Sequence, residues 1–168
     1  KNATLIFSTS DISVGVAFFN GLSLTQKYNH PEYPLKIISK QIGNEKPITS
    51  NVATFNILNA LLVEDKKKKP VLISDPTFEQ ELNIITNKQF QVLYGRQLYE
   101  PLKICGHRLK KQVIKETNRH ANGKTLFYTA QKGIIQLQGN PEDLRLLYQD
   151  GLGIRRAQGY GTLELVNT

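Results

Sequence analysis

The sequence predicts an α+β protein built from tandem ferredoxin-like (RRM-like) domains, the first of them incomplete. Residues 47–168 show apolar patterns in the order strand, helix, strand, strand, helix, strand, which is the element order of one whole β-α-β-β-α-β unit. Residues 1–46 show only strand, helix and strand, the second half of such a unit. The linker is expected at 46–49, where Lys46 and Pro47 interrupt the apolar pattern.

In the first part we expect a strand over 2–8 and a helix capped by Ser10 or Asp11 that ends near Gly21. A polar loop with two prolines follows, and then a strand over 35–42. The apolar stripe of the helix is formed by Ile12, Val16 and Phe19.

A half-unit of this kind leaves an uncovered core face and an unpaired strand edge. The sequence begins at Lys1 and contains no methionine. We therefore expect an upstream segment that supplies the first half of the N-terminal domain.

The second part begins with an apolar strand over 52–63, followed by four lysines at 66–69 and a short apolar stretch at 71–73. The lysines are interpreted as a solvated turn, with RNA contact as the alternative. Asp75 and Pro76 predict the start of a helix that stops at Gly95. Its buried face is expected to carry Phe78, Leu82, Ile85 and Val92.

Two strands, 102–116 and 124–138, are expected next, joined by a turn near Asn122-Gly123. Asn140 and Pro141 then predict the start of a helix over 141–150, with Leu144, Leu147 and Tyr148 at helical spacing. The alternating residues 162–166 predict the final strand.

Composition and cysteine content narrow the class of protein. The chain has 168 residues, 39% of them hydrophobic, which is enough for a core, and it has no apolar run of membrane-spanning length. A single cysteine, Cys105, excludes an internal disulfide framework and fits a reducing compartment. We therefore expect a cytoplasmic protein without a membrane partner.

The charge is concentrated in one segment. The formal net charge is +8, and residues 103–132 hold eight basic side chains against one acid, Glu116. A localised basic face is typical of a protein that binds a polyanion. A solvated hairpin whose lysines serve only solubility is the alternative.

The sequence GLGIRRAQGYG at 151–161, here called the glycine-rich loop, has two Gly-hydrophobic-Gly turns around five residues that include Arg155 and Arg156. Such a loop suits phosphate contact, through backbone amides and bidentate arginines. The glycines in question are Gly151, Gly153, Gly159 and Gly161. A helix before the loop and a strand after it reverse the order of a P-loop or dinucleotide fingerprint, which excludes those sites. A purely mechanical role, as helix cap and strand bulge, stays open.

In this position the loop resembles the C-terminal motif of the RAMP superfamily of CRISPR-associated proteins: Gly-h-Gly, five residues, Gly-h-Gly, where h is hydrophobic. Within the superfamily the chain is most similar to the repeat-processing CRISPR endoribonuclease. The supporting stretches are SDPTFEQEL (74–82), VLYGR (92–96), EPLKI (100–104), GIIQLQGNPEDLRLLYQDGLG (133–153) and AQGYGTLELV (157–166). The resemblance covers roughly residues 50–166.

The resemblance implies an endoribonuclease that cuts CRISPR precursor RNA within its repeats, with no metal and no cofactor, leaving 2′,3′-cyclic phosphate and 5′-hydroxyl ends. This chemistry needs a base, an acid and a cation around the scissile phosphate. The family's usual catalytic histidine lies on the first helix of the first domain. We therefore expect it upstream of Lys1, and the catalytic residues of this chain stay unassigned.

Three histidines are present. His30, in a loop, is a candidate for catalysis; His107 is a candidate for RNA contact, and His120 is expected at the surface. Cys105 and His107 offer too few ligands for zinc. Tyr128, Phe127 and Tyr160 are interpreted either as packing residues or as base-stacking residues. The RNA-binding residues we expect are the four loop glycines, Arg155, Arg156, Lys103, His107, Arg108, Lys110 and Lys111.

The expected partner is CRISPR repeat RNA. One alternative is a non-catalytic RAMP subunit that binds guide RNA within a CRISPR effector complex, and it would share the same fold, loop and basic face. Another is a ferredoxin-like domain that binds a small molecule, which would not need the concentrated positive charge. A homodimer also stays open.

Overall fold

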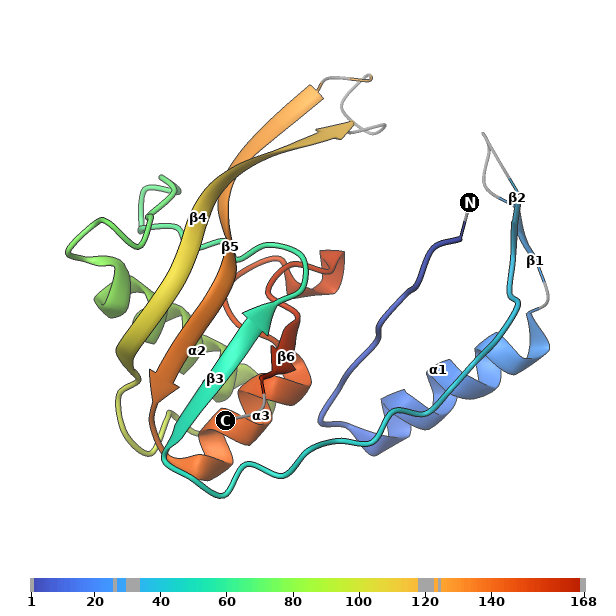
Figure 1. Ribbon diagram of the computed structural model, residues 1–168, viewed down its shortest axis with the longest axis horizontal. Coiled ribbons are helices and arrows are strands. Elements are labelled where there is room, and N and C mark those ends of the chain that lie inside the picture. The colour runs from blue at the N-terminus through green and yellow to red at the C-terminus, as the bar shows by residue number, and fades with distance from the viewer. Residues whose placement is uncertain (1, 26, 30–33, 118–122, 124, 167–168) are drawn as a thin grey trace. The chain divides into compact units, whose positions relative to one another are not determined.

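The computed structural model describes residues 2–25, 27–29, 34–117, 123 and 125–166. Contacts between residues divide the chain into two units, Lys1–Lys46 and Pro47–Thr168. Both are shown in Figure 1.

The second unit holds a four-stranded antiparallel sheet with the strand order β4-β5-β3-β6. Its elements are β3 (Val52–Ile57), α2 (Phe78–Tyr94), β4 (Lys103–Thr117), β5 (Thr125–Gln138), α3 (Pro141–Asp150) and β6 (Leu163–Leu165). The connections β3-α2-β4 and β5-α3-β6 each pass over one intervening strand (Figure 1). This is the split β-α-β arrangement that the predicted element order requires.

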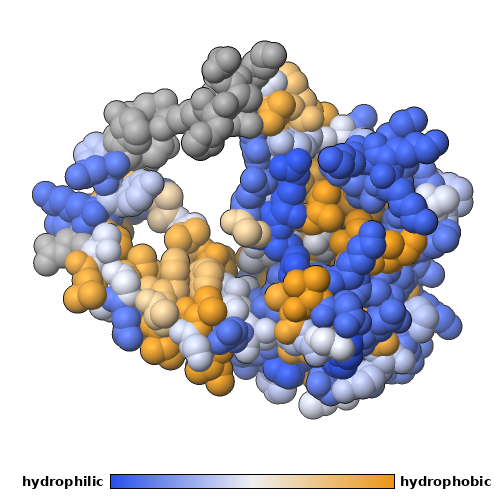
Figure 2. All heavy atoms as spheres, turned by 180° about the vertical axis from the view of Figure 1, so that it is seen from behind, coloured by the Kyte–Doolittle hydropathy of each residue, from blue (hydrophilic) through white to orange (hydrophobic). Residues whose placement is uncertain are grey.

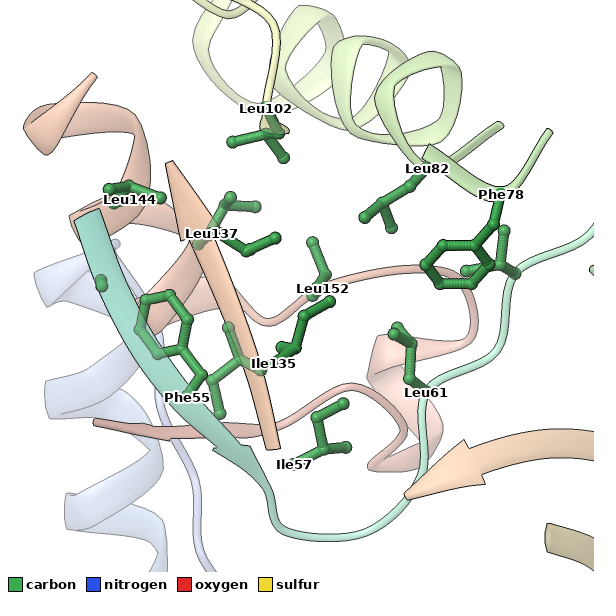
Figure 3. Close-up of a cluster of buried hydrophobic side chains, with 14 of the residues drawn as sticks. Phe55, Ile57, Leu61, Phe78, Leu82, Leu102, Ile135, Leu137, Leu144 and Leu152 are labelled. Atoms are coloured by element: carbon green, nitrogen blue, oxygen red, sulfur yellow. The ribbon is translucent and has the colours of Figure 1, made fainter. Parts of the chain in front are cut away.

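The core of this unit lies where β3 and β5 meet α2 and α3. Burial alternates along β3, so that Ala53, Phe55 and Ile57 are buried while their neighbours are only partly so. Figure 3 shows Phe55 of β3 in the same apolar cluster as Leu82 of α2 and Leu144 of α3. One apolar cluster therefore fixes both helices against the sheet.

The predicted helix ends are confirmed with small shifts. Helix α2 starts at the N-cap Thr77, whose amide and hydroxyl both donate to Asp75, and it stops at Gly95 with φ of 68°. Helix α3 starts at Asn140, whose side chain accepts from the Glu142 amide, with Pro141 in the first turn.

One prediction for α2 is wrong: Val92 is 82% exposed. The buried face runs through Phe78, Leu82 and Phe90, and it also includes the polar side chains of Thr86 and Gln89. Because each residue turns the helix by about 100°, this face is rotated away from Val92. The two buried polar residues could not be recognised from hydrophobic spacing.

The strand predicted over 52–63 is too long. Strand β3 ends at Ile57, and Leu61 instead forms an isolated bridge with Gln131 of β5. The apolar stretch 71–73 forms no strand either, although the Val71 amide donates to the Val63 carbonyl. Leu61, Leu62, Val63 and Val71 are buried outside any strand, because a short apolar run is equally compatible with a buried loop.

The first unit contains α1 (Ile12–Leu24) and a two-stranded sheet of β1 (Lys27–Asn29) and β2 (Pro34–Lys36). Asp11 caps α1 as predicted, but the helix continues past Gly21. The strand predicted over 2–8 is not formed, and the one predicted over 35–42 is reduced to β2. A strand requires a hydrogen-bonded neighbour, and among the described residues, 2–8 and 37–42 have no strand partner.

Apolar side chains of the first unit lie largely at its surface. None of the residues of α1 is buried, and Ile12 and Leu24 are more than four-fifths exposed. Orange spheres of these residues gather over this unit in Figure 2. Within the part of the chain that the structure describes, no helix has the length and apolar character needed to cross a bilayer.

Candidate nucleic-acid interface

The glycine-rich loop is anchored by the hydrophobic residue of each Gly-hydrophobic-Gly turn. Leu152 is fully buried in the main core (Figure 3), and Tyr160 is buried in a second cluster with Ala60, Leu62 and Ala130. The motif therefore places two apolar anchors at the ends of the loop, and Arg155 and Arg156 lie between them. This supports the mechanical interpretation of the motif and also fixes where the arginines emerge.

Two loop glycines are required by close backbone approach. A Cβ atom on Gly153 would lie 2.5 Å from the Leu62 carbonyl oxygen, and one on Gly161 would lie 1.8 Å from the Leu152 carbonyl oxygen. Both residues also have positive φ, 83° and 68°. No side chain fits at either position without moving the backbone.

Much of the loop backbone is hydrogen-bonded within the chain. The amides of Gly151, Leu152, Ile154, Gln158, Gly159 and Gly161 all donate to carbonyls of the described residues. These six amides therefore already have acceptors within the chain, and their hydrogen bonds stabilise the loop. The expectation that the loop amides grip a phosphate is limited to the remaining ones.

The two loop arginines have different surroundings. Arg155 is exposed, and its guanidinium lies over the Tyr128 ring of β5, 4.3 Å from the ring centroid. Arg156 is half-buried, and its Nη1 donates to the Asp150 carbonyl at the end of α3. Burial lowers the pKa of Arg156, and the nearby Asp150 carboxylate opposes that shift. Arg155 is thus the more exposed of the two arginines, while Arg156 caps a helix.

The loop is also tied to β4 and β5, here called the basic hairpin. The Tyr160 hydroxyl donates to the carboxylate of Glu116, the single acid of residues 103–132. Burial, reinforced by this hydrogen bond, raises the pKa of Tyr160 to about 12. Tyr160 is only 3% exposed, so its ring packs inside the protein and does not offer a surface for base stacking.

Basic side chains line both strands of the hairpin. Lys110 of β4 lies directly opposite Lys132 of β5, an arrangement of like charges that is unfavourable in the absence of an anion. The described basic residues of the hairpin are all exposed, and none forms an ion pair with another described residue. They are Lys103, Arg108, Lys110, Lys111, Lys115 and Lys132. Hydrophilic surface dominates the second unit in Figure 2.

Of the three histidines, the structure describes only His107, which is exposed on β4 opposite Ile135. His30, the candidate for catalysis, and His120 lie outside the described residues, as do Arg119 and Lys124. Cys105 is exposed and unpaired with any cysteine. Among the described residues, no cluster of three or more His, Cys, Asp or Glu side chains suitable for a metal is found.

Two supporting contacts were missed by sequence reasoning. Gln89 of α2 is buried, and its Nε2 donates to the Gly151 carbonyl at the start of the loop, at 3.2 Å. Asp143, at the start of α3, is fully buried and accepts from Arg96 Nη1 and from the Tyr99 amide, each at 2.7 Å. The position of Gln89 on the same face of α2 as Phe78 and Leu82 is the sequence feature that could have indicated a buried polar contact. No sequence pattern joins Asp143 to Arg96.

Residues 43–165 match the family model described as "CRISPR associated protein Cas6, C-terminal". The chain belongs to this Cas6 family. The match spans the whole second unit except its last three residues, and it includes the glycine-rich loop and the basic hairpin.

Solved structures of the Cas6 type share the fold. One described as a Cas6-related gene product from Pyrococcus furiosus has a TM-score of 0.73 at 13% identity, over 95% of this chain and 66% of that one. A structure described as CRISPR associated protein Cas6 has a TM-score of 0.67 at 15% sequence identity, and the match covers 95% of this chain and 66% of that one. A RAMP protein described as binding different RNA substrates has a TM-score of 0.64 at 14% sequence identity, and the match covers 95% of this chain and 67% of that one.

These likenesses confirm the predicted α+β fold of ferredoxin-like domains. The chain spans about two thirds of the length of those relatives. A search of curated proteins finds no match.

Proposed function

We propose that this chain is part of a metal-independent endoribonuclease that cleaves CRISPR precursor RNA within its repeats. The products would be guide RNAs with 2′,3′-cyclic phosphate and 5′-hydroxyl ends. Membership of the Cas6 family supports the reaction class. The proposal keeps the division into 1–46, the second half of an N-terminal ferredoxin-like domain, and 47–168, the C-terminal domain that carries the RNA surface.

One observation carries the RNA-binding part of this proposal. The Arg155 guanidinium lies on Tyr128, so the cation of the glycine-rich loop and the cations of the basic hairpin belong to one continuous surface. The acid of that segment, Glu116, is occupied by Tyr160. Glu116 makes no ion pair with the described basic side chains of the hairpin, whose positive charge can therefore bind the phosphates of a nucleic acid.

A second candidate is a non-catalytic RAMP subunit that holds guide RNA in a CRISPR effector complex. The observation in its favour is the position of His107, the histidine that the structure describes, which lies on β4 without a hydrogen bond to another described side chain. A cleaving site needs an acid and a base close to the bound cation. Along β4, His107 lies seven residues from Ile114, the strand partner of the Tyr128 that Arg155 contacts, so this histidine is not beside the loop cation.

The reaction is tested with the full-length protein and its own repeat RNA in EDTA, followed by mapping of the product ends. We expect cleavage at one site in the repeat, with a 2′,3′-cyclic phosphate on the upstream product. Salt-sensitive binding without cleavage would support the guide-holding subunit. Cleavage that disappears in EDTA and returns with a divalent cation would contradict the metal-independent mechanism.

The two loop arginines provide a matched test of the RNA surface. Arg155→Ala is expected to lower affinity for single-stranded RNA about tenfold and to reduce the slope of log K against log salt by about 0.7, the value for one phosphate contact. Arg156→Ala should change affinity less than about threefold but should destabilise the fold by about 1 kcal/mol, because a helix-capping hydrogen bond is lost. Fluorescence anisotropy at several salt concentrations, together with urea unfolding, measures both. The opposite pattern would show that Arg156 contacts the RNA instead.

A further inference from the structure

A surface hollow of about 300 Å³ lies between three segments that are distant in the sequence. Glu64, Lys68 and Pro70 come from the turn after Val63, Phe127 to Thr129 come from β5, and Arg155 comes from the glycine-rich loop. The four-lysine turn, interpreted from sequence as a solvated tip, therefore contributes a cation to the same surface as the loop and the hairpin.

The backbone around this hollow is held in an unusual conformation. Lys68 and Arg155 have φ of 60° and 58°, and among the described residues they are the non-glycine residues with positive φ. Both line the hollow. Left-handed backbone at a non-glycine residue is unfavourable, and such residues cluster at ligand sites.

Asp65 fixes the turn that presents Lys68. Its carboxylate accepts from the amides of Lys67 and Lys69, each at 2.8 Å, and its carbonyl accepts from the Lys68 amide. Arg155 is held by Tyr128 on the other side. The backbone of Lys68 and the guanidinium of Arg155 are thus positioned before any ligand arrives.

The remaining side chains offer an aromatic surface and a hydrogen-bond acceptor. Phe127 is 67% exposed, which is unusual for so large an apolar ring. Glu64 is half-buried, and its carboxylate makes no hydrogen bond or ion pair with another described residue. An aromatic ring, two cations and one free acceptor match the parts of a nucleotide in single-stranded RNA: a base to stack, flanking phosphates, and an amino group.

We propose that this hollow binds one unstacked base of single-stranded RNA and favours bases that carry an amino group over uracil. Phe127 stacks on the base, Lys68 and Arg155 contact the adjacent phosphates, and Glu64 accepts a hydrogen bond from the amino group. A carboxylate only accepts hydrogen bonds, so it pairs with the 4-amino group of cytosine and repels the 4-carbonyl of uracil. This inference rests on the proposed RNA-binding function and adds base selectivity to it.

The test compares oligocytidylate with oligouridylate of equal length, using the whole chain and fluorescence anisotropy. These oligomers have the same charge and ring size, and their bases differ in the group at position 4 and in the proton at the adjacent ring nitrogen. We expect about tenfold tighter binding of oligocytidylate. Glu64→Gln should bring the ratio of the two affinities to within about twofold of one, because a glutamine amide can also donate to the uracil carbonyl.

Phe127→Ala should weaken both oligomers about tenfold and leave their ratio unchanged. Two variants serve as controls for the loss of a charge or of an apolar side chain at sites away from the hollow. Glu100→Gln, at an exposed position, should leave the ratio as in the wild type, and Val92→Ala, at an exposed position of α2, should leave both affinities as in the wild type.

The outcomes separate the two proposals. Equal affinities for the two oligomers in the unmodified chain, or a ratio unaffected by Glu64→Gln, would overturn the base pocket while the RNA-binding function stands. Binding of neither oligomer would overturn the RNA-binding function and the pocket together.

Discussion

Replacing Gly161 by alanine is expected to destabilise the second unit by about 3–5 kcal/mol. The new methyl group would meet the Leu152 carbonyl oxygen at 1.8 Å, at a residue whose φ is 68°. The cost combines overpacking against a rigid backbone with strain at a left-handed position. Two hydrogen bonds that hold the loop, Leu152 amide to Gly161 carbonyl and Gly161 amide to Ala60 carbonyl, would be displaced with it.

Gly159→Ala is the matched control, since it lies in the same loop with a similar φ of 84°. A Cβ atom there would meet only the Asn59 amide nitrogen, at 3.9 Å. Its expected cost is therefore the backbone strain alone, about 1–2 kcal/mol. Urea unfolding of both variants measures the difference. Equal losses would show that the close approach of Gly161 to Leu152 is absent in solution.

Asp143→Ala is expected to destabilise the same unit by about 3 kcal/mol. The carboxylate is fully buried, and its loss leaves the Tyr99 amide without its acceptor and Arg96 without its buried counter-charge, although Arg96 Nη1 keeps the Gln97 carbonyl as an acceptor. Removing one partner of such a buried pair is costly because the other stays desolvated. Since α3 leads directly into Gly151, the loop should also lose its fixed position and RNA affinity should fall.

Glu142→Ala provides the comparison, because Glu142 occupies the same first turn of α3 and contacts the same arginine. Its carboxylate lies 3.6 Å from Arg96 Nη2 and is about half exposed. An exposed pair of this kind contributes less than about 1 kcal/mol. Thermal unfolding of the two variants should therefore differ clearly. Similar losses would mean that the arginine pairs with both carboxylates alike and that burial of Asp143 is not decisive.

Several elements were determined by local sequence alone. The caps at Asp11 and Asn140, the stop at Gly95, and the two long strands of the hairpin follow from residues adjacent in the chain, whose backbone preferences do not depend on distant partners. The order β-α-β-β-α-β of the second unit follows from them in turn.

The burial and contacts of individual side chains depend on tertiary structure and could not be predicted from neighbouring residues. Arg155 and Arg156 are identical in type, but only packing directs one over Tyr128 and the other to the Asp150 carbonyl. Val92 satisfies a helical spacing and is exposed because the core contacts a different part of that helix.

The same holds for the surfaces around the loop. Lys68 and Arg155 are nearly ninety positions apart in the sequence and line one hollow because the turn after Val63 and the glycine-rich loop meet at β5. Local sequence specifies backbone conformation through short-range sterics and hydrogen bonds, whereas side-chain burial and proximity depend on which distant segments pack together.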